Sequence, residues 1–277
     1  MAVVVLSYRG RATLADAVRS LLAQDVAAEI VVVHSGGDSV RDGLRSEGLN
    51  ARVIEVPQRL LPGGARNLGI ASTNAPHVAF LADDCIAEPG WLRARLRAHQ
   101  EGAVAVASAL LSHEPNNPVA LAAHLSLFIR RMPRMVASQT LCYGASYDRR
   151  LFAVHGMFRD DLEGGEDTEF HQRLAPAEKP VWRPEVRTVH VGVETLSAFL
   201  TDQFRRGRRI AHAWREIAAF SGGAVAKDAI QRTAFIFRHA FSVVEPQQRW
   251  AAMLALPLIA LGNLVYAAGA LSAGSRA

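Results

Sequence analysis

The sequence predicts an α/β fold in which a mostly parallel central sheet is flanked by helices. Short, β-branched apolar runs alternate with segments whose apolar residues recur at helical spacing, and this alternation is typical of a parallel sheet covered on both faces. With 277 residues, half of them hydrophobic, the chain is long and apolar enough for one large domain or two small ones. A disordered or fibrous protein is therefore excluded.

The first third of the chain supplies most of the predicted sheet. Strands are predicted at residues 2–7, 29–33, 52–56 and 77–81, and helices at 13–23, 40–47 and 64–71. Parallel sheets bind ligands beyond the carboxyl ends of their strands, so the residues that follow each strand are the candidates for a site.

Two adjacent carboxylates, Asp83 and Asp84, follow the fourth predicted strand. Mg²⁺ and Mn²⁺ are typically bound by one or two carboxylates together with water and substrate phosphates, so this pair is a candidate site for a metal bound to a diphosphate. The alternative is that the two acids only cap the helix that begins near Trp91.

A second acidic pair, Glu166 and Asp167, lies in the first turn of a helix predicted after Gly164 and Gly165. Acids at this position complement the helix dipole. A carboxylate there is also well placed to accept a proton from a bound hydroxyl group. Between the two acidic pairs, a strand is predicted at 141–147 and a short helix at 149–154, and a later strand is predicted at 185–190.

Four segments of the chain, in this order, resemble the motifs of one enzyme family. They are Val3 to Arg9, the Gly-rich run Pro62 to Ile70, Phe80 to Cys85 followed by Pro89-Gly-Trp-Leu, and Tyr143 to Ser146 continuing through Glu166-Asp167 to Arg173-Leu174. They resemble glycosyltransferase family 2, the inverting enzymes of GT-A fold, from Val3 to about Arg215. The resemblance implies a GT-A domain over residues 1–192, followed by a helical extension over residues 193–277.

The resemblance also implies an activity and the residues that perform it. The enzyme would move a sugar from a nucleoside-diphosphate sugar to a hydroxyl of a glycan or lipid-linked acceptor, as in polysaccharide biosynthesis. Such a reaction needs stabilisation of the departing diphosphate and deprotonation of the acceptor. The implied roles are catalysis by Asp167 with Glu166, binding of Mn²⁺ or Mg²⁺ by Asp84 and His190, and donor binding by Ser7, Tyr8, Ser35, Arg66 and Asp83.

The chain departs from the family pattern at two positions. Ala82 stands where the family often has an acid, and His34-Ser-Gly-Gly stands where an Asp commonly reads the nucleotide base. These departures motivate an alternative, a catalytically degenerate module that binds a nucleotide sugar or glycan. They also leave the identity of the base open.

The charge composition predicts a polyanionic partner. The net charge is +5, and all the basic residues are Arg except Lys179 and Lys227. Because no nucleic-acid module is recognisable, we expect a diphosphate or an anionic lipid and no nucleic acid. The two cysteines cannot form a disulfide framework, and no secretory signal is visible, so a cytoplasmic protein is expected.

Residues 251–271 carry no charge and are long enough to span a bilayer. Pro257 and Asn263 within them favour a hairpin or a helix packed against protein as the alternative. Two Arg-rich stretches, 119–134 and 199–214, are candidate amphipathic helices that lie on anionic lipid, or ordinary helices with a solvated charged side. Together these stretches predict association with the inner face of the cell membrane.

Overall fold

The computed structural model describes residues 1–216 and 221–274. The chain forms two compact units, and each is described by itself. The first unit comprises Met1–Leu110 and Ala137–Val191, and the second comprises Leu111–Val136 and Gly192–Ala277. The predicted assignment of residues 1–192 and 193–277 to a transferase domain and an extension stays a prediction, and within it residues 217–220 and 275–277 lie outside the described residues.

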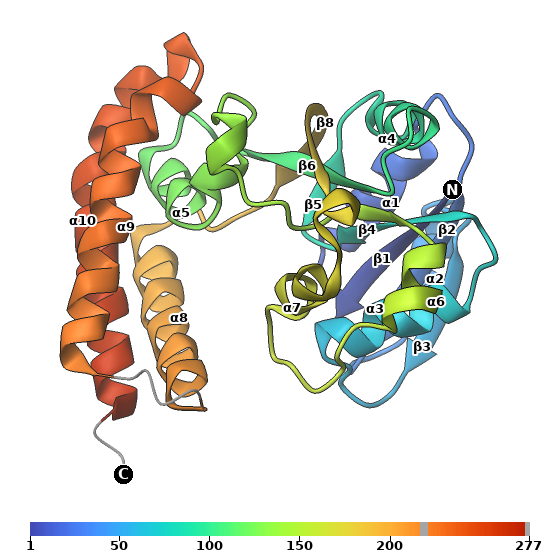
Figure 1. Ribbon diagram of the computed structural model, residues 1–277, viewed down its shortest axis with the longest axis horizontal. Helices are drawn as coiled ribbons and strands as arrows, with labels where there is room; N and C mark the ends of the chain where they lie inside the picture. Colours follow the sequence, from blue (N-terminus) through green and yellow to red (C-terminus); the bar gives the residue numbers. More distant parts are fainter. Residues whose placement is uncertain (217–220, 275–277) are drawn as a thin grey trace. The chain divides into compact units, whose positions relative to one another are not determined.

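The first unit is built on a mixed, eight-stranded sheet with the strand order β3-β2-β1-β4-β7-β6-β8-β5 (Figure 1). The pairs β3-β2, β2-β1 and β1-β4 are parallel, whereas β4-β7, β7-β6 and β8-β5 are antiparallel. The strands are β1 Ala2–Tyr8, β2 Glu29–Ser35, β3 Arg52–Val56, β4 His77–Ala82, β5 Cys85–Ala87, β6 Ala105–Ser112, β7 Ser146–Asp148 and β8 Val181–His190.

Helices cover both faces of this sheet because successive side chains of a strand point to opposite sides. Val3 and Val5 of β1 join one hydrophobic cluster with α1 and α4, and Val4 joins the opposite cluster with α3 and α7. The α/β fold predicted from the sequence is therefore confirmed. The helices of this unit are α1 Leu14–Leu22, α2 Arg41–Ser46, α3 Pro62–Ala71, α4 Trp91–Gln100, α6 Arg150–His155 and α7 Glu166–Arg173, with 3₁₀ turns at Ala137–Gln139 and Pro176–Glu178.

The strand predicted at 141–147 is wrong over most of its length, since only Ser146–Asp148 is extended and paired. Gly144 has a φ of +60°, a left-handed conformation that interrupts a strand. The sequence also missed β5, which has three residues, and β6. The alanine-rich β6 carries neither β-branched enrichment nor alternation, so no periodic signal distinguishes it.

The second unit consists of packed helices: α5 Pro118–Phe128, α8 Leu196–Glu216, α9 Gly222–Val243 and α10 Arg249–Gly274, with 3₁₀ turns at Ile129–Arg131 and Pro246–Gln248. Backbones of α8 and α10 approach closely. A Cβ at Gly207 would collide with the Tyr266 carbonyl oxygen, and one at Gly269 would collide with that of Phe204. Asn263 of α10 is buried and donates a hydrogen bond to Oγ1 of Thr233 on α9 at 2.8 Å.

Both Arg-rich stretches of the sequence lie in this unit. Of the two alternatives for 119–134, the structure supports the ordinary core-facing helix over the one that lies on lipid, because residues Ala120 to Ser126 of α5 are buried in the core of the unit. A helix that is apolar all round is a core helix. The stretch 199–214 is part of α8, as expected, although its side chains from His212 onward lie outside the described part of the chain.

Candidate active site

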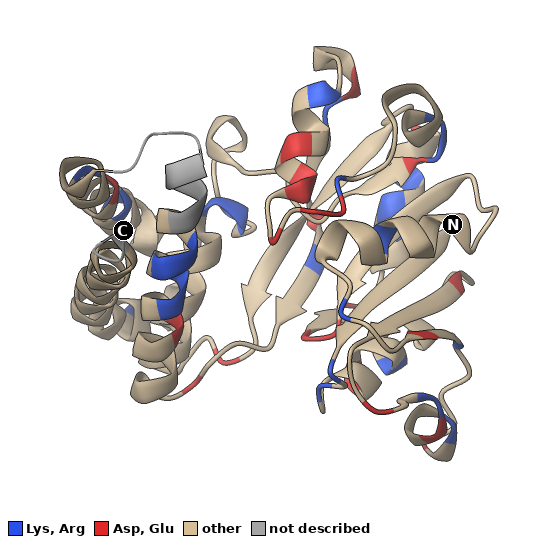
Figure 2. Ribbon diagram, turned by 90° about the horizontal axis from the view of Figure 1, so that it is seen from below, with Lys and Arg blue, Asp and Glu red and all other residues tan. Residues whose placement is uncertain are grey.

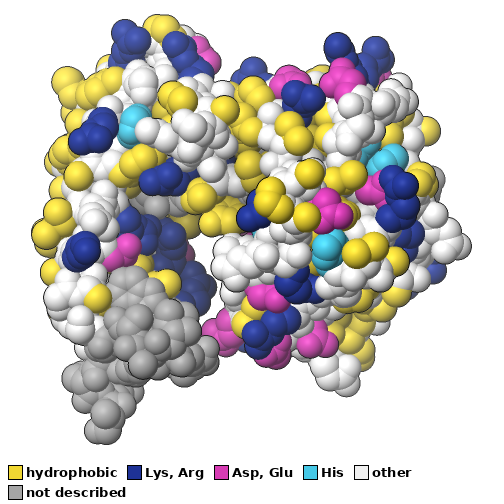
Figure 3. All heavy atoms as spheres, in the orientation of Figure 1, with side chains coloured by type: hydrophobic (Ala, Val, Ile, Leu, Met, Phe, Trp, Pro, Cys, Tyr) yellow, Lys and Arg dark blue, Asp and Glu magenta, His cyan; other side chains and the backbone are white. Residues whose placement is uncertain are grey.

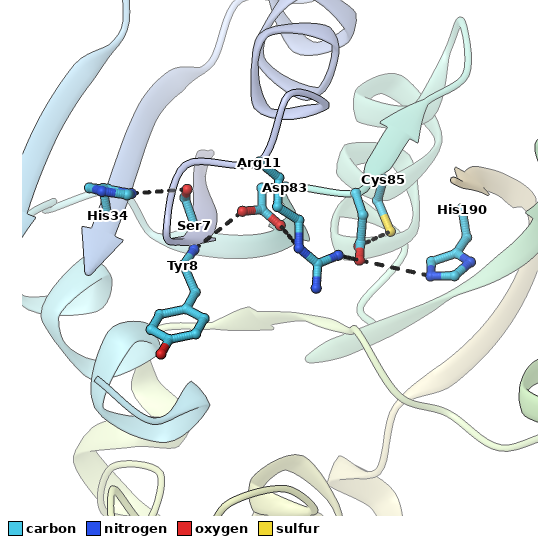
Figure 4. Close-up of polar contacts among 8 residues, drawn as sticks. Ser7, Tyr8, Arg11, His34, Asp83, Cys85 and His190 are labelled. Atoms are coloured by element: carbon cyan, nitrogen blue, oxygen red, sulfur yellow. Dashed lines mark hydrogen bonds and ion pairs between the residues drawn. The ribbon is translucent and has the colours of Figure 1, made fainter. Parts of the chain in front are cut away.

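Three neighbouring parallel strands bring four of the predicted donor-binding residues, Ser7, Tyr8, Ser35 and Asp83, to one edge of the sheet. Figure 4 shows Ser7, Tyr8 and Asp83 there. The register pairs Ser7 with His34 and Tyr8 with Ser35, and β4 runs beside β1 as far as Ala82. The residues that end β1 and β2 therefore face the acidic pair that follows β4, as the parallel topology requires.

Asp83 is held in place by hydrogen bonds to the backbone of β1. Its side chain is buried, and its Oδ2 accepts a hydrogen bond from the Tyr8 backbone N–H at 3.2 Å. Its own backbone N–H donates to the Leu6 carbonyl at 3.0 Å. Burial raises the pKa of Asp83 above its ordinary value; the Arg11 guanidinium and the Tyr8 N–H oppose this shift, and the adjacent Asp84 adds to it.

Asp84 is more exposed and faces His190, whose Nε2 lies 3.9 Å from Asp84 Oδ2. The pairing of β5 with β8 brings the two together, because Cys85 is the register partner of His190. The Asp84 carbonyl accepts a hydrogen bond from the Val191 N–H at 2.8 Å. Two residues that are 106 positions apart in the chain thus meet at the edge of the sheet.

Arg11 neutralises this acidic pair, although it belongs to none of the motifs seen in the sequence. Its Nη1 forms an ion pair with Asp84 Oδ2, and its Nε lies 3.7 Å from Asp83 Oδ1 (Figure 4). Arg11 is more than half exposed. The signal that could have found it is its place in the loop after β1, next to the strand that precedes the acids.

The residues at this edge fit a divalent cation only in part. Among the described residues there is no group of three or more His, Cys, Asp and Glu side chains that could hold a metal. Two ligand atoms each about 2.1 Å from one ion lie at most about 4.2 Å apart. The 3.9 Å between Asp84 and His190 is within this limit, so these two could bind one Mn²⁺ or Mg²⁺, with the other positions filled by water and diphosphate oxygens.

His34, which replaces the usual acid after the second strand, is bonded through both ring nitrogens. Its Nε2 lies 3.0 Å from the Asp38 carbonyl oxygen, which can only accept, so Nε2 carries the proton and donates. Nδ1 therefore accepts from the Ser7 hydroxyl at 3.1 Å. His34 and Ser7 are buried, and their polar atoms are engaged with each other rather than free to read a nucleotide base.

Tyr8 is the exposed aromatic side chain of this edge. Two guanidinium groups lie near its ring, that of Arg9 at 5.2 Å and that of Arg59 at 5.4 Å from the ring centroid. The Arg9 backbone N–H donates to the carbonyl of Ser35 at 3.2 Å, which joins the loops after β1 and β2. A flat ring near two cations suits a ligand that carries both an aromatic base and phosphates.

The second acidic pair begins with Glu166, which forms a buried ion pair with Arg66. Arg66 Nη2 lies 3.0 Å from Glu166 Oε1, and both side chains are at least nine-tenths buried. The guanidinium of Arg66 also stacks on Phe80 and Phe158, 4.9 and 5.3 Å from the ring centroids. The structure therefore places Arg66 with Glu166, and its predicted role toward the donor stays a prediction.

The other residues of the Gly-rich segment join α3 to the loop before α7. The Asn67 side chain donates to the Phe158 carbonyl at 2.8 Å and accepts from the Phe158 N–H at 3.1 Å. A Cβ at Gly63 would collide with the carbonyl of Arg159. The segment thus has a structural explanation, which is to fix the loop that leads to Glu166.

Asp167 is only partly buried, and its Oδ1 accepts from the N–H of Thr168 at 2.8 Å. Behind it, the hydroxyl of the buried Tyr147 lies 2.7 Å from His171 Nε2. Burial lowers the pKa of His171 to about 4, although Asp167 opposes the shift, and burial raises the pKa of Tyr147. At neutral pH the Tyr147 hydroxyl therefore donates to a neutral His171. No pattern in the sequence indicated this pair.

The comparison with family models decides the identity. Residues 2–152, more than half of the chain, match the model described as glycosyl transferase family 2. The chain belongs to this family. The resemblance inferred from the four motifs is thereby confirmed. As a family 2 glycosyltransferase, the chain is an enzyme that transfers a sugar from a nucleotide-sugar donor.

Solved structures show the same fold at low sequence identity. The mannosyltransferase PcManGT from Pyrobaculum calidifontis, in complex with GDP-Man and Mn²⁺, is 16% identical with a TM-score of 0.55, covering 95% of this chain and 86% of that chain. The 1–349 fragment of TarS from S. aureus, in complex with UDP-GlcNAc, is 13% identical with a TM-score of 0.54, covering 97% of this chain and 92% of that chain. A comparison with the curated proteins finds no match.

Proposed function

We propose that this family 2 enzyme is a metal-dependent, inverting glycosyltransferase. Its donor is a nucleoside-diphosphate sugar, and its acceptor is a hydroxyl of a glycan or lipid-linked molecule. The observation that carries the proposal is that each of two acidic pairs has a buried first member bonded into the scaffold and a more exposed second member, Asp84 in one pair and Asp167 in the other.

On the donor side, Asp84 and His190 are the residues that would hold Mn²⁺ or Mg²⁺. A bound cation would neutralise charge that develops on the departing diphosphate. Tyr8 and the two arginines near its ring would lie against the nucleotide. Ser7 and Ser35, at the ends of β1 and β2, would contribute to the same donor site. Asp83 would lie toward the ribose. The distant structural relatives that were solved with GDP-Man and Mn²⁺ and with UDP-GlcNAc support a donor of this class.

On the acceptor side, Asp167 would act as the general base. Its carboxylate takes the proton of the acceptor hydroxyl while the hydroxyl oxygen forms a bond to the anomeric carbon of the sugar. The bond from that carbon to the diphosphate oxygen breaks, and the diphosphate leaves with the electron pair. Because the nucleophile and the leaving group are on opposite faces of the sugar, one displacement inverts the anomeric configuration.

Glu166 would contribute to this step by holding Asp167 in position. Its buried ion pair with Arg66 fixes the first turn of α7, in which Asp167 is the next residue. Gly165, with a φ of +83°, lets the chain turn sharply into this helix.

Calorimetry with the purified full chain tests the donor side. UDP-, GDP- and dTDP-sugars are titrated with and without Mn²⁺, and we expect one of the three to bind in the presence of Mn²⁺. Asp84→Asn should lose this binding by at least tenfold, whereas the matched variant Asp16→Asn, an exposed acid of α1, should keep it. Mn²⁺-independent binding, or no loss in Asp84→Asn, would overturn the metal assignment. Absence of binding by all three donors would overturn the proposed donor class, whereas binding of a donor without its turnover would favour the degenerate module.

A further inference from the structure

Between Trp250 and Leu271, helix α10 has a long exposed face without a polar side chain. Its exposed large side chains recur three or four positions apart and therefore share one side of the helix. The inner side of α10 is buried against the rest of the helical unit. Residues 250 to 271 cover about 32 Å at the α-helical rise. The large apolar side chains of the outer face are Trp250, Met253, Leu254, Leu261, Leu264 and Leu271, and Leu264 is 69% exposed.

Helix α9, which packs beside α10, continues this surface. Ile230, Phe237 and Phe241 are exposed and recur at helical spacing on one side of α9. Figure 3 shows apolar side chains along the outer edge of the α9–α10 pair. We call these three residues and the outer face of α10 the apolar face.

The exposed charges carried by helices α9 and α10 themselves are positive. The exposed charged residues on the described parts of α9 and α10 are Lys227, Arg238 and Arg249, and none is an acid. Lys227 and Arg238 flank the apolar residues of α9, and Arg249 precedes Trp250 at the start of α10. Cations and a tryptophan at the border of an apolar helix face suit the interface of an anionic lipid bilayer.

The Arg-rich helix α8 presents its exposed cations on the opposite side of the unit. Phe199, Gln203 and Gly207 form its buried side, and Gly207 meets α10. Arg205, Arg208 and Arg209 lie about half a turn of the helix away from that side and are exposed. Figure 2 shows this run of positive charge along the helix that leads into the grey segment.

From this arrangement we infer that the helical unit docks in the plane of an anionic membrane through the apolar face of α9 and α10. The arginines of α8 then point away from the lipid, into water. The segment Pro246–Ala273 contains an 18-residue window with a mean hydropathy of 1.9, and its helix is long and apolar enough to cross a membrane by length and composition. A crossing α10 would carry the attached α8, with its three exposed arginines, into the hydrocarbon layer, which strongly disfavours that arrangement.

Flotation of the full chain with vesicles tests the docking surface. Vesicles of phosphatidylcholine with 30% phosphatidylglycerol are compared with pure phosphatidylcholine, and we expect the chain to float with the anionic vesicles. The double variant Met253→Glu with Leu264→Glu changes two exposed positions and should reduce the bound fraction at least tenfold. The matched double variant Arg205→Gln with Arg208→Gln should bind within about twofold of the unchanged chain.

Other results would overturn the inference. Failure of the full chain to bind either vesicle would do so, as would loss of binding in the α8 variant but not in the α10 variant. A concentration-dependent dimer in vesicle-free buffer that the α10 variant abolishes would assign the face to a second copy of the chain. Resistance to extraction at high pH would indicate a crossing helix. Circular dichroism of each variant must match that of the unchanged chain.

Discussion

The two acidic pairs of the sheet unit differ in how their cation is held. At the donor edge, Arg11 neutralises Asp84 from a loop and is more than half exposed. At the start of α7, Arg66 neutralises Glu166 from within the core, where its guanidinium lies over two aromatic rings. An exposed ion pair contributes little to stability and is easily exchanged, whereas a buried pair cannot be broken without leaving a charge in a medium of low dielectric constant. The pair at the donor edge is therefore suited to exchange Arg11 for a metal ion, whereas the pair of Arg66 with Glu166 is suited to fix the start of α7.

The largest effect is expected from breaking the buried pair. Arg66→Met leaves the Glu166 carboxylate buried without its partner, so the free energy of unfolding should fall by about 3–5 kcal/mol. Urea denaturation measures this change. The matched variant Arg97→Met removes an exposed pair with Glu101 and should cost less than about 1 kcal/mol.

A double variant separates charge from packing at this site. Adding Glu166→Gln to Arg66→Met removes the unpaired charge and should restore part of the lost stability. No restoration would show that the loss in Arg66→Met comes from packing on Phe80 and Phe158 alone.

A smaller effect is expected at the exposed pair. Arg11→Gln removes the cation that competes with a metal for Asp84, so the affinity for Mn²⁺ without donor should rise about fivefold, the equivalent of about 1 kcal/mol for an exposed ion pair. Calorimetric titration of Mn²⁺ measures this change. Arg19→Gln, which removes an exposed cation beside Asp16, serves as the control. Weaker Mn²⁺ binding in Arg11→Gln would mean that Arg11 organises the acidic pair instead of competing for it.

A further effect concerns the pH dependence of stability, and it depends on His171, which lies on the same helix as the second acidic pair. The pKa of His171 is lowered from 6.5 to about 4 in the folded chain. Between these pH values the unfolded chain binds a proton at His171 that the folded chain does not bind. As far as His171 is concerned, the free energy of unfolding therefore has its full value above pH 6.5 and decreases as the pH falls toward 4. His171→Gln should reduce the pH dependence of the free energy of unfolding in this window by up to one proton. The exposed His113→Gln should leave it unchanged.

The sequence predicted the parallel part of the sheet and both acidic pairs because strong local patterns encode them. The strands β1 to β4 are β-branched and apolar, and each is followed by a polar loop, so the edge that gathers Ser7, Ser35 and Asp83 follows from topology alone. The antiparallel β6 was not predicted because it lacks a run of β-branched apolar residues.

The partners of the acids could not be predicted in the same way. Arg11, Tyr147 and His171 act through contacts with residues far away in the chain, and no spacing rule links such positions. Arg66 was selected from its motif, but its ion pair with Glu166, 100 positions later, appears only when α3 and α7 pack on the same face of the sheet. Burial of α5 likewise depends on helices that follow it by about 70 residues or more.

A comparison of Asp167→Asn with Glu166→Gln tests most directly the division between a fixed and a reactive acid. Single-turnover sugar transfer and urea denaturation are measured on both variants, with the exposed Glu163→Gln as the control. We predict that Asp167→Asn lowers the transfer rate by about 10²–10⁴-fold at unchanged stability. Glu166→Gln should lower the free energy of unfolding and affect the rate less. An Asp167→Asn variant that transfers sugar at the original rate, or a Glu166→Gln variant that alone abolishes transfer at full stability, would contradict the account.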